Sequence, residues 1–145
     1  MARVVIDTNV WVSSIINPFG FPAILRTYFE NGLFDVLISE PMFEELAEVL
    51  NRPRIKNKYG INDGDIEQLL LLIEERSENI PLSGDVAICR DIDDNLVIET
   101  AIKGKADFLV SRDDDIKFDK DVFAFLLQHE VTVISISKFL DFIKQ

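Results

Sequence analysis

Four acidic residues stand at points where their carboxylates could share one site, and they are Asp7, Glu45, Asp94 and Asp113. Asp7 follows the apolar run Val4–Ile6, and Asp113 comes shortly after a second apolar run that ends at Ser111. Carboxylates gathered within a few ångströms repel one another unless they are protonated or bridged by cations. Oxygen ligands select Mg²⁺ or Mn²⁺, whereas Zn²⁺ prefers His or Cys, and this chain has one of each, His129 and Cys89. The pattern therefore favours a divalent-cation site, with Asp115 as a near fifth ligand.

Each aspartate position also has a simpler structural interpretation. Asp7 could cap the next helix through an Asx turn in which Asn9 takes part. Asp91, Asp93 and Asp94 lie at the start of a predicted helix, where negative charge complements the helix dipole. Which of these three is a metal ligand therefore stays open.

Glu45 is one of three neighbouring glutamates on a single predicted helix. The apolar residues of that helix are spaced i, i+3, i+4 and i+7 and centre near Leu46. At about 100° per residue, Glu45 lies at the edge of this apolar face, while Glu44 and Glu48 lie well away from it. Glu40, in the first turn, lies at a similar angle on the opposite edge of that face. We interpret Glu44 and Glu48 as a solvated acidic face and Glu45 as the central glutamate best placed to be a ligand.

Short apolar segments alternate along the chain with amphipathic segments, which is typical of buried parallel strands joined by helices. The expected strands are Val4–Ile6, Leu33–Ile38, Val86–Cys89, Ala106–Ser111 and Val131–Ile136. The expected helices are Val10–Ile16, Ala23–Glu30, 40–50, Asn62–Glu78, 96–104, Lys120–Glu130 and Lys138–Lys144. They predict an α/β fold with three α/β/α layers and a central parallel sheet of four to five strands. Ligands of such sheets bind at the carboxyl ends of the strands, where the acidic residues would stand.

The 145 residues are most simply one domain, residues 1–145, because a chain of this length can bury a sufficient hydrophobic core without disulfides or a structural metal. A single cysteine excludes an internal disulfide. The longest apolar runs, Leu69–Ile73 and Val122–Leu127, have five and six residues, against about 20 for a membrane span. We therefore expect a soluble, cytoplasmic protein with no membrane partner.

The net charge of −11 argues against passive binding of nucleic acid. Bound cations would change this balance, because two Mg²⁺ ions would bring −11 to −7. The one basic stretch of the chain contains Arg52, Arg54, Lys56 and Lys58 and ends beside Tyr59. Alternating cations next to an aromatic residue are typical of phosphate contacts, but an exposed linker can have the same composition.

The chain resembles the PIN-domain nucleases, in particular the single-domain kind found as the toxin of bacterial and archaeal toxin-antitoxin pairs. The matching segments cover nearly the full length, and their order and spacing make the resemblance specific. They are Val5–Val10, Ser39–Leu46, Arg52-Pro53, Arg90-Asp91-x-Asp93-Asp94, Ala101, Ala106–Ser111 and Arg112-Asp113-x-Asp115. The resemblance implies a PIN-like fold with Asp7, Glu45, Asp94 and Asp113 as catalytic residues. It implies metal binding by Asp7, Asp94, Asp113 and Asp115, with Asn9 and Ser111 orienting ligands or water.

The resemblance also implies a function, which is hydrolysis of RNA phosphodiester bonds with Mg²⁺ or Mn²⁺ as cofactor. The implied partners are the RNA substrate, a small antitoxin protein and a second copy in a homodimer, and Arg112 joins the basic stretch as a candidate RNA contact. An alternative is a PIN-fold binding or regulatory protein with little or no nuclease turnover. A phosphoacceptor receiver domain is disfavoured because the second strand ends in Ser39, and an Asp-x-Asp phosphatase because Asn9 stands two residues after Asp7.

Overall fold

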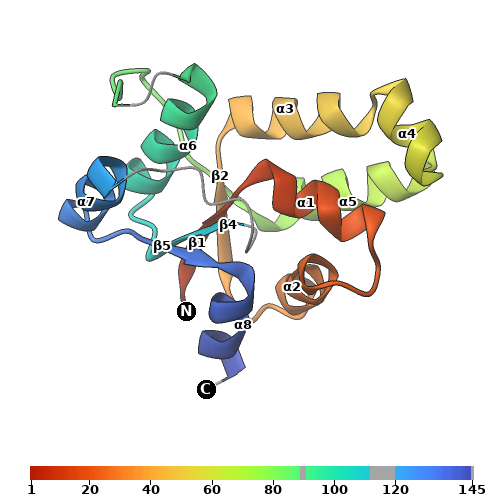
Figure 1. Cartoon of the computed structure of the whole chain (residues 1–145), viewed down its shortest axis with the longest axis horizontal. Helices are drawn as coiled ribbons and strands as arrows, with labels where there is room; N and C mark the ends of the chain where they lie inside the picture. The colour runs from red at the N-terminus through yellow and green to blue at the C-terminus, as the bar shows by residue number, and fades with distance from the viewer. Residues whose placement is uncertain (89–90, 112–119, 145) are drawn as a thin grey trace.

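A five-stranded parallel sheet forms the centre of the computed structural model, which describes residues 1–88, 91–111 and 120–144 (Figure 1). Its strands are β1 (Arg3–Ile6), β2 (Asp35–Ile38), β3 (Glu78–Asn79), β4 (Phe108–Ser111) and β5 (Thr132–Ser135). They lie in the order β3-β2-β1-β4-β5, and each neighbouring pair is parallel. The predicted parallel sheet is confirmed, with β1 at its centre and Asp7 directly after β1.

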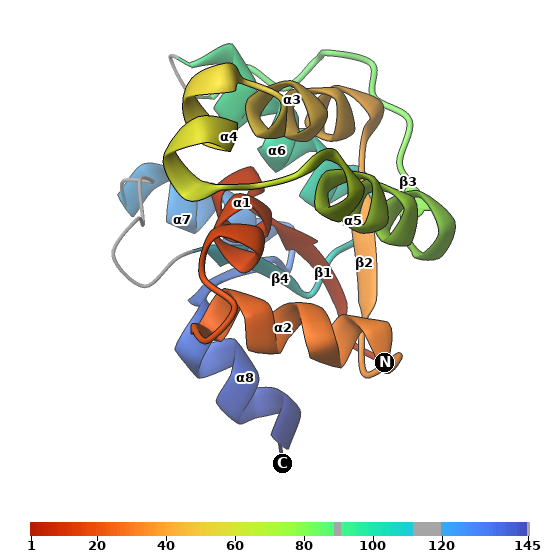
Figure 2. The same cartoon turned by 90° about the vertical axis from the view of Figure 1, so that its right-hand side faces the viewer.

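Helices cover both faces of this sheet. They are α1 (Thr8–Ile16), α2 (Phe21–Glu30), α3 (Glu40–Leu50), α4 (Pro53–Tyr59), α5 (Asp63–Arg76), α6 (Ile92–Lys103), α7 (Lys120–Gln128) and α8 (Ile136–Lys144). Figure 1 shows α6 and α7 on one side of the strands and α1, α2 and α5 on the other, and Figure 2 shows α8 beside α2. The predicted three-layer α/β/α architecture is therefore confirmed. None of the described helices combines the length and the apolar character needed to cross a membrane.

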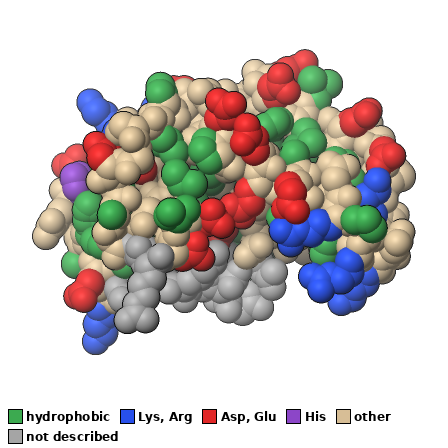
Figure 3. Space-filling view, turned by 90° about the horizontal axis from the view of Figure 1, so that it is seen from above, with side chains coloured by type: hydrophobic (Ala, Val, Ile, Leu, Met, Phe, Trp, Pro, Cys, Tyr) green, Lys and Arg blue, Asp and Glu red, His purple; other side chains and the backbone are tan. Residues whose placement is uncertain are grey.

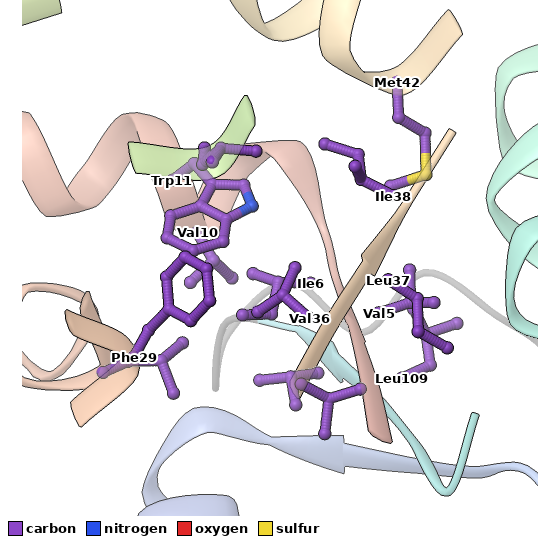
Figure 4. Close-up of a cluster of buried hydrophobic side chains, with 14 of the residues drawn as sticks. Val5, Ile6, Val10, Trp11, Phe29, Val36, Leu37, Ile38, Met42 and Leu109 are labelled. Carbon is purple, nitrogen blue, oxygen red and sulfur yellow. The ribbon is translucent and has the colours of Figure 1, made fainter. Parts of the chain in front are cut away.

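The three central strands, β2, β1 and β4, are buried on both faces, which explains why their sequences are apolar without alternation. Val4, Val5 and Ile6 of β1 are all at most 1% exposed. Figure 4 shows Val5 with apolar residues of the neighbouring strands on one side of the sheet, and Ile6 facing the Trp11 side. Trp11 is 1% exposed, with its ring centroid 5.7 Å from that of Phe29, so it belongs to the core.

The expected strand Val86–Cys89 is wrong for its described part, because residues 86–88 form no strand, while Cys89 lies outside the described residues. The fifth strand is instead β3, which pairs with β2 at the edge of the sheet. The segment before Cys89 is hydrogen-bonded to helix side chains rather than to a neighbouring strand. The backbone N–H of Ile88, for example, donates to Oδ1 of Asn95 on α6, 3.0 Å away.

The basic stretch, for which an exposed linker was the alternative interpretation, forms a helix, α4, and Arg52, Arg54 and Lys58 of this stretch are exposed. α3 ends at Leu50, and Pro53 begins α4, because its fixed φ suits the first position of a helix. α4 ends at Gly60, whose φ of 62° is the left-handed conformation that glycine adopts easily. α4 therefore holds its basic side chains at helical spacing.

Candidate active site

Asp7 directly follows the central strand, β1, which fixes its position. Its backbone N–H donates to the carbonyl of Val110 on β4, 3.0 Å away, so the hydrogen bonding of β1 continues up to this residue. Asp7 is also the N-cap of α1, and its carboxylate accepts from the backbone N–H of Asn9 over a long 3.5 Å. The capping interpretation is thus confirmed, but it does not exclude a ligand role, because a carboxylate has about four acceptor sites.

Glu45 lies half-buried on α3, whose buried side chains are Met42, Leu46 and Leu50. Glu44 and Glu48 are exposed, as predicted for a solvated face. Glu48 accepts two hydrogen bonds from the Arg52 guanidinium, at 3.0 and 2.7 Å. These bonds, together with the nearby charge of Glu45, raise the pKa of Arg52 above its ordinary value. Glu45 is therefore the inward-facing glutamate of α3, close to the start of the basic helix.

The three aspartates around the start of α6 take different places. Asp91 is the N-cap of the helix, and its carboxylate accepts from the backbone N–H of Asp93 at 2.8 Å. Asp91 and Asp93 are exposed, whereas Asp94 is half-buried. The simple capping interpretation thus applies to Asp91. Asp94 is the member of the three that is turned toward the protein.

Helix packing brings the elements of Asp7, Glu45 and Asp94 together. α3 contacts both α1 and α6, and α6 contacts β1. Figure 3 shows Asp and Glu side chains gathered in the middle of the face seen from above, toward which β1 and β2 run in Figure 1. Arg112, Asp113 and Asp115 lie outside the described residues. Within residues 1–88, 91–111 and 120–144, no three His, Cys, Asp or Glu side chains form a group that could hold a metal ion.

Ser111 provides an independent observation at the same edge of the sheet. It is the last residue of β4, paired in register with Ser135, and follows Val110, the partner of Ile6 on β1. Ser111 is 4% exposed, and its Oγ has no hydrogen-bond partner among the described residues. A buried hydroxyl left unpaired costs about 1–3 kcal/mol, so a water or ion at this place would relieve it. This hydroxyl and the carboxylates of Asp7, Glu45 and Asp94 would all offer oxygen atoms as metal ligands. Such ligands fit Mg²⁺ or Mn²⁺.

Sequence reasoning missed Glu99, a glutamate of α6 that is 1% exposed. Its carboxylate accepts hydrogen bonds from the backbone N–H groups of Ser83 at 2.7 Å and Gly84 at 3.0 Å, and it pairs with Lys103 at 3.1 Å. Burial raises the pKa of the Glu99 carboxyl, but these donors outweigh burial and hold the pKa below its ordinary value. Glu99 therefore ties the loop at Ser83 and Gly84 to α6, the helix that also contains Asp94. The available signal was a charged residue within a run of buried helix positions.

Comparison with known proteins identifies the architecture. The PIN domain family model matches residues 3–115, a span that includes all five predicted acidic ligands. The chain belongs to the PIN domain family. PIN domains are in general nucleases, and the resemblance seen in the sequence is confirmed at this level. This PIN domain is also similar to an uncharacterised protein of Methanocaldococcus jannaschii, with 34% identity over 115 residues that cover 79% of this chain and 72% of that protein.

Proposed function

We propose that this PIN domain is a divalent-metal-dependent endoribonuclease that hydrolyses RNA phosphodiester bonds. The observation that carries the proposal is the family match over residues 3–115, which spans every predicted acidic ligand. The position of Asp7, at the carboxyl end of the central strand, adds to it, because open parallel sheets bind their ligands at that end. The predicted Asp113 and Asp115 would complete a ligand set that the described carboxylates do not form alone.

Each residue would have a distinct role in this reaction. Asp7, Asp94, Asp113 and Asp115 would hold Mg²⁺ or Mn²⁺, and Asn9 and the buried hydroxyl of Ser111 would orient ligands or water. A bound divalent cation supplies Lewis-acid chemistry, which activates water and stabilises developing charge on oxygen. Glu45 would hold one metal ion or its water. The new bond joins water oxygen to phosphorus, the bond from phosphorus to the 3′ oxygen breaks, and a proton goes to that oxygen, which leaves 5′-phosphate and 3′-hydroxyl ends.

The acidic protein needs local positive charge to hold RNA. Arg52, Arg54, Lys56 and Lys58 are the candidate contacts on the structure, with Arg112 as a further candidate outside the described residues. Bound cations would reduce repulsion at the acidic site, while α4 would attract phosphates at its side.

We further propose that the protein acts in the cytoplasm as the toxin of a toxin-antitoxin pair and forms a homodimer. Phe19 is 92% exposed and Phe21 is 51% exposed, and apolar side chains of this size on a surface favour contact with another chain. Co-purification with a small protein encoded by the adjacent gene, and light scattering of the purified chain, test these two partners. A monomer that binds no such protein would contradict this part of the proposal.

The nuclease activity is tested with total RNA, Mg²⁺ and mapping of the new ends. We expect 5′-phosphate ends for the natural protein and loss of cleavage with EDTA or in Asp7→Asn and Asp113→Asn. Asp141→Asn makes the same chemical change at an exposed position of α8 and is expected to cleave normally. Equal cleavage in EDTA and in Asp7→Asn would contradict the proposal. RNA binding without cleavage would favour the alternative, a PIN-fold binding protein.

A further inference from the structure

The four cations of the basic stretch differ in what they contact. Arg52 pairs with Glu48 on α3 at 2.7 Å, and Lys56 pairs with Asp63 at the start of α5. Arg54 and Lys58 are both exposed and make no ion pair with the residues that the structure describes. Two of the four positive charges are thus already neutralised within the protein, and two remain available to a ligand.

Arg54, Lys58 and Tyr59 form what we call the α4 cation face. Residues four apart lie on the same side of a helix, so Arg54 and Lys58 point to one side of α4. Tyr59, the last residue of the helix, is 41% exposed, and the Lys58 Nζ lies 5.2 Å from the centre of its ring. This face therefore combines two positive charges with an exposed aromatic ring.

The combination matches single-stranded nucleic acid better than a duplex. Proteins that bind single strands use positive charges along the backbone and aromatic side chains on which unpaired bases stack. In a duplex the base faces are covered, and the modules that bind double-stranded RNA extend over about 16 base pairs. A seven-residue helix such as α4 is only about 10 Å long, so it can follow just a few nucleotides.

The α4 cation face also lies on the correct part of the molecule. α4 contacts α3, the helix of Glu45, and the charge of Glu45 acts on Arg52 at the start of α4. Figure 3 shows Lys and Arg side chains gathered near one end of the face whose middle holds the acidic side chains. The chain as a whole has a net charge of −11, so a local gathering of positive charge is where phosphates are favoured.

We propose that Arg54, Lys58 and Tyr59 bind single-stranded RNA beside the acidic site, with the two cations on two phosphates and the tyrosine ring under an unpaired base. This inference rests on the proposed ribonuclease function and specifies which residues of this chain would hold its substrate. Within the basic stretch we assign the contact to Arg54 and Lys58 rather than to Arg52 and Lys56, because the latter two already pair with Glu48 and Asp63.

The first experiment measures binding of a fluorescently labelled eight-nucleotide single-stranded RNA across a series of salt concentrations. All proteins contain Asp7→Asn, so that the RNA stays intact, and all are measured in Mg²⁺. We expect Arg54→Gln with Lys58→Gln to lower the slope of log K against log salt by about 1.4, since each phosphate contact on a single strand contributes about 0.7. The matched control, Lys138→Gln with Lys144→Gln on α8, removes the same charge and should keep the slope of the parent. Equal slopes in the two double variants would overturn the inference.

The second experiment tests the aromatic ring and the strandedness of the RNA. Tyr59→Leu should weaken binding of the single strand by about fivefold or more, and Tyr59→Phe should restore it, because stacking needs the ring and not the hydroxyl. A duplex of the same sequence should bind more weakly and be insensitive to Tyr59→Leu. Urea unfolding of each variant verifies that it is folded. Equal effects of Tyr59→Leu on single strand and duplex would overturn the inference.

These measurements separate the inference from the proposed function. RNA binding that depends on Arg54, Lys58 and Tyr59, in a natural protein that does not cleave, would support the binding face and contradict the nuclease. Metal-dependent cleavage that is unchanged by the three substitutions would support the nuclease and overturn the binding face. If RNA does not bind, but an acidic protein partner binds and is lost with Arg54→Gln and Lys58→Gln, the face belongs to a protein interface and the inference is wrong.

Discussion

Glu99→Gln is the substitution for which the structure gives the sharpest expectation. The Glu99 carboxylate accepts from the backbone N–H groups of Ser83 and Gly84 while the side chain is 1% exposed. Glutamine has the same size but only one acceptor oxygen, and its NH₂ group would face an N–H donor. Hydrogen bonds to charged groups contribute about 1.5–3 kcal/mol, and a buried donor left unpaired costs about 1–3 kcal/mol. We therefore expect the free energy of unfolding to fall by about 2–4 kcal/mol.

Urea unfolding followed by tryptophan fluorescence measures this loss, because Trp11 is the only tryptophan and lies in the core. The difference in free energy of unfolding between the natural protein and Glu99→Gln should also depend on pH. Since the folded state holds the pKa of Glu99 below its ordinary value, the carboxylate stabilises the fold at neutral pH. That contribution is lost as the pH falls below about 4.3 and then through the pKa of Glu99 in the folded state. The difference in free energy of unfolding between the two proteins should therefore shrink in acid.

Glu48→Gln is the matched control, because Glu48 also pairs with a cation four residues away but is exposed. Its loss of stability should be much smaller, since solvent screens an exposed pair. The reasoning about Glu99 would be refuted by equal losses in the two variants. A difference between natural protein and Glu99→Gln that stays constant from neutral pH down to pH of about 3 would refute it as well.

Two further substitutions test the packing around α6. A Cβ at Gly104 would lie 2.8 Å from Cδ1 of Leu37, so Gly104→Ala should destabilise the protein by about 1–3 kcal/mol in urea unfolding. Gly64→Ala is its control, because the nearest atom there is 3.2 Å away, and equal losses would contradict the expectation. Asn95→Ala removes the acceptor of the Ile88 N–H beside Asp94, so RNA cleavage should fall while the urea midpoint falls less than in Glu99→Gln. Unchanged cleavage would show that this hydrogen bond does not position Asp94.

The acidic site shows where sequence reasoning succeeds and where it ends. Asp7 was expected at the end of a buried strand, and the structure places it at the end of β1. Glu45 was expected at the edge of the buried face of its helix, and it is half-buried there. Both expectations follow from residue periodicity. The choice among Asp91, Asp93 and Asp94 was open, because only the path of the loop decides that Asp91 caps α6 while Asp94 turns inward.

The wrong strand and the missed edge strand have the same physical origin. Val86 and its neighbours have the composition of a strand, but side chains of α6 take up the backbone donors of this segment, including that of Ile88. β3 consists of Glu78 and Asn79, which are exposed and have no apolar pattern, and it exists because it pairs with the edge of β2. A backbone segment becomes a strand only where a partner lies beside it, and that is a property of the folded chain.

Most of the helices and central strands could be predicted from the sequence, because helical and strand periodicity, capping residues and the order of the acidic residues are local properties of the chain. The sequence therefore predicted the α/β/α layers, the central strand that ends in Asp7 and the basic stretch that starts at Arg52. How charges are shared between segments depends on the tertiary structure. Glu99 meets the amides of a loop about fifteen residues earlier, and Lys56 is neutralised by Asp63 while Arg54 is not. Charge pairing depends on distances between elements, and those distances are set by how the helices pack on the sheet.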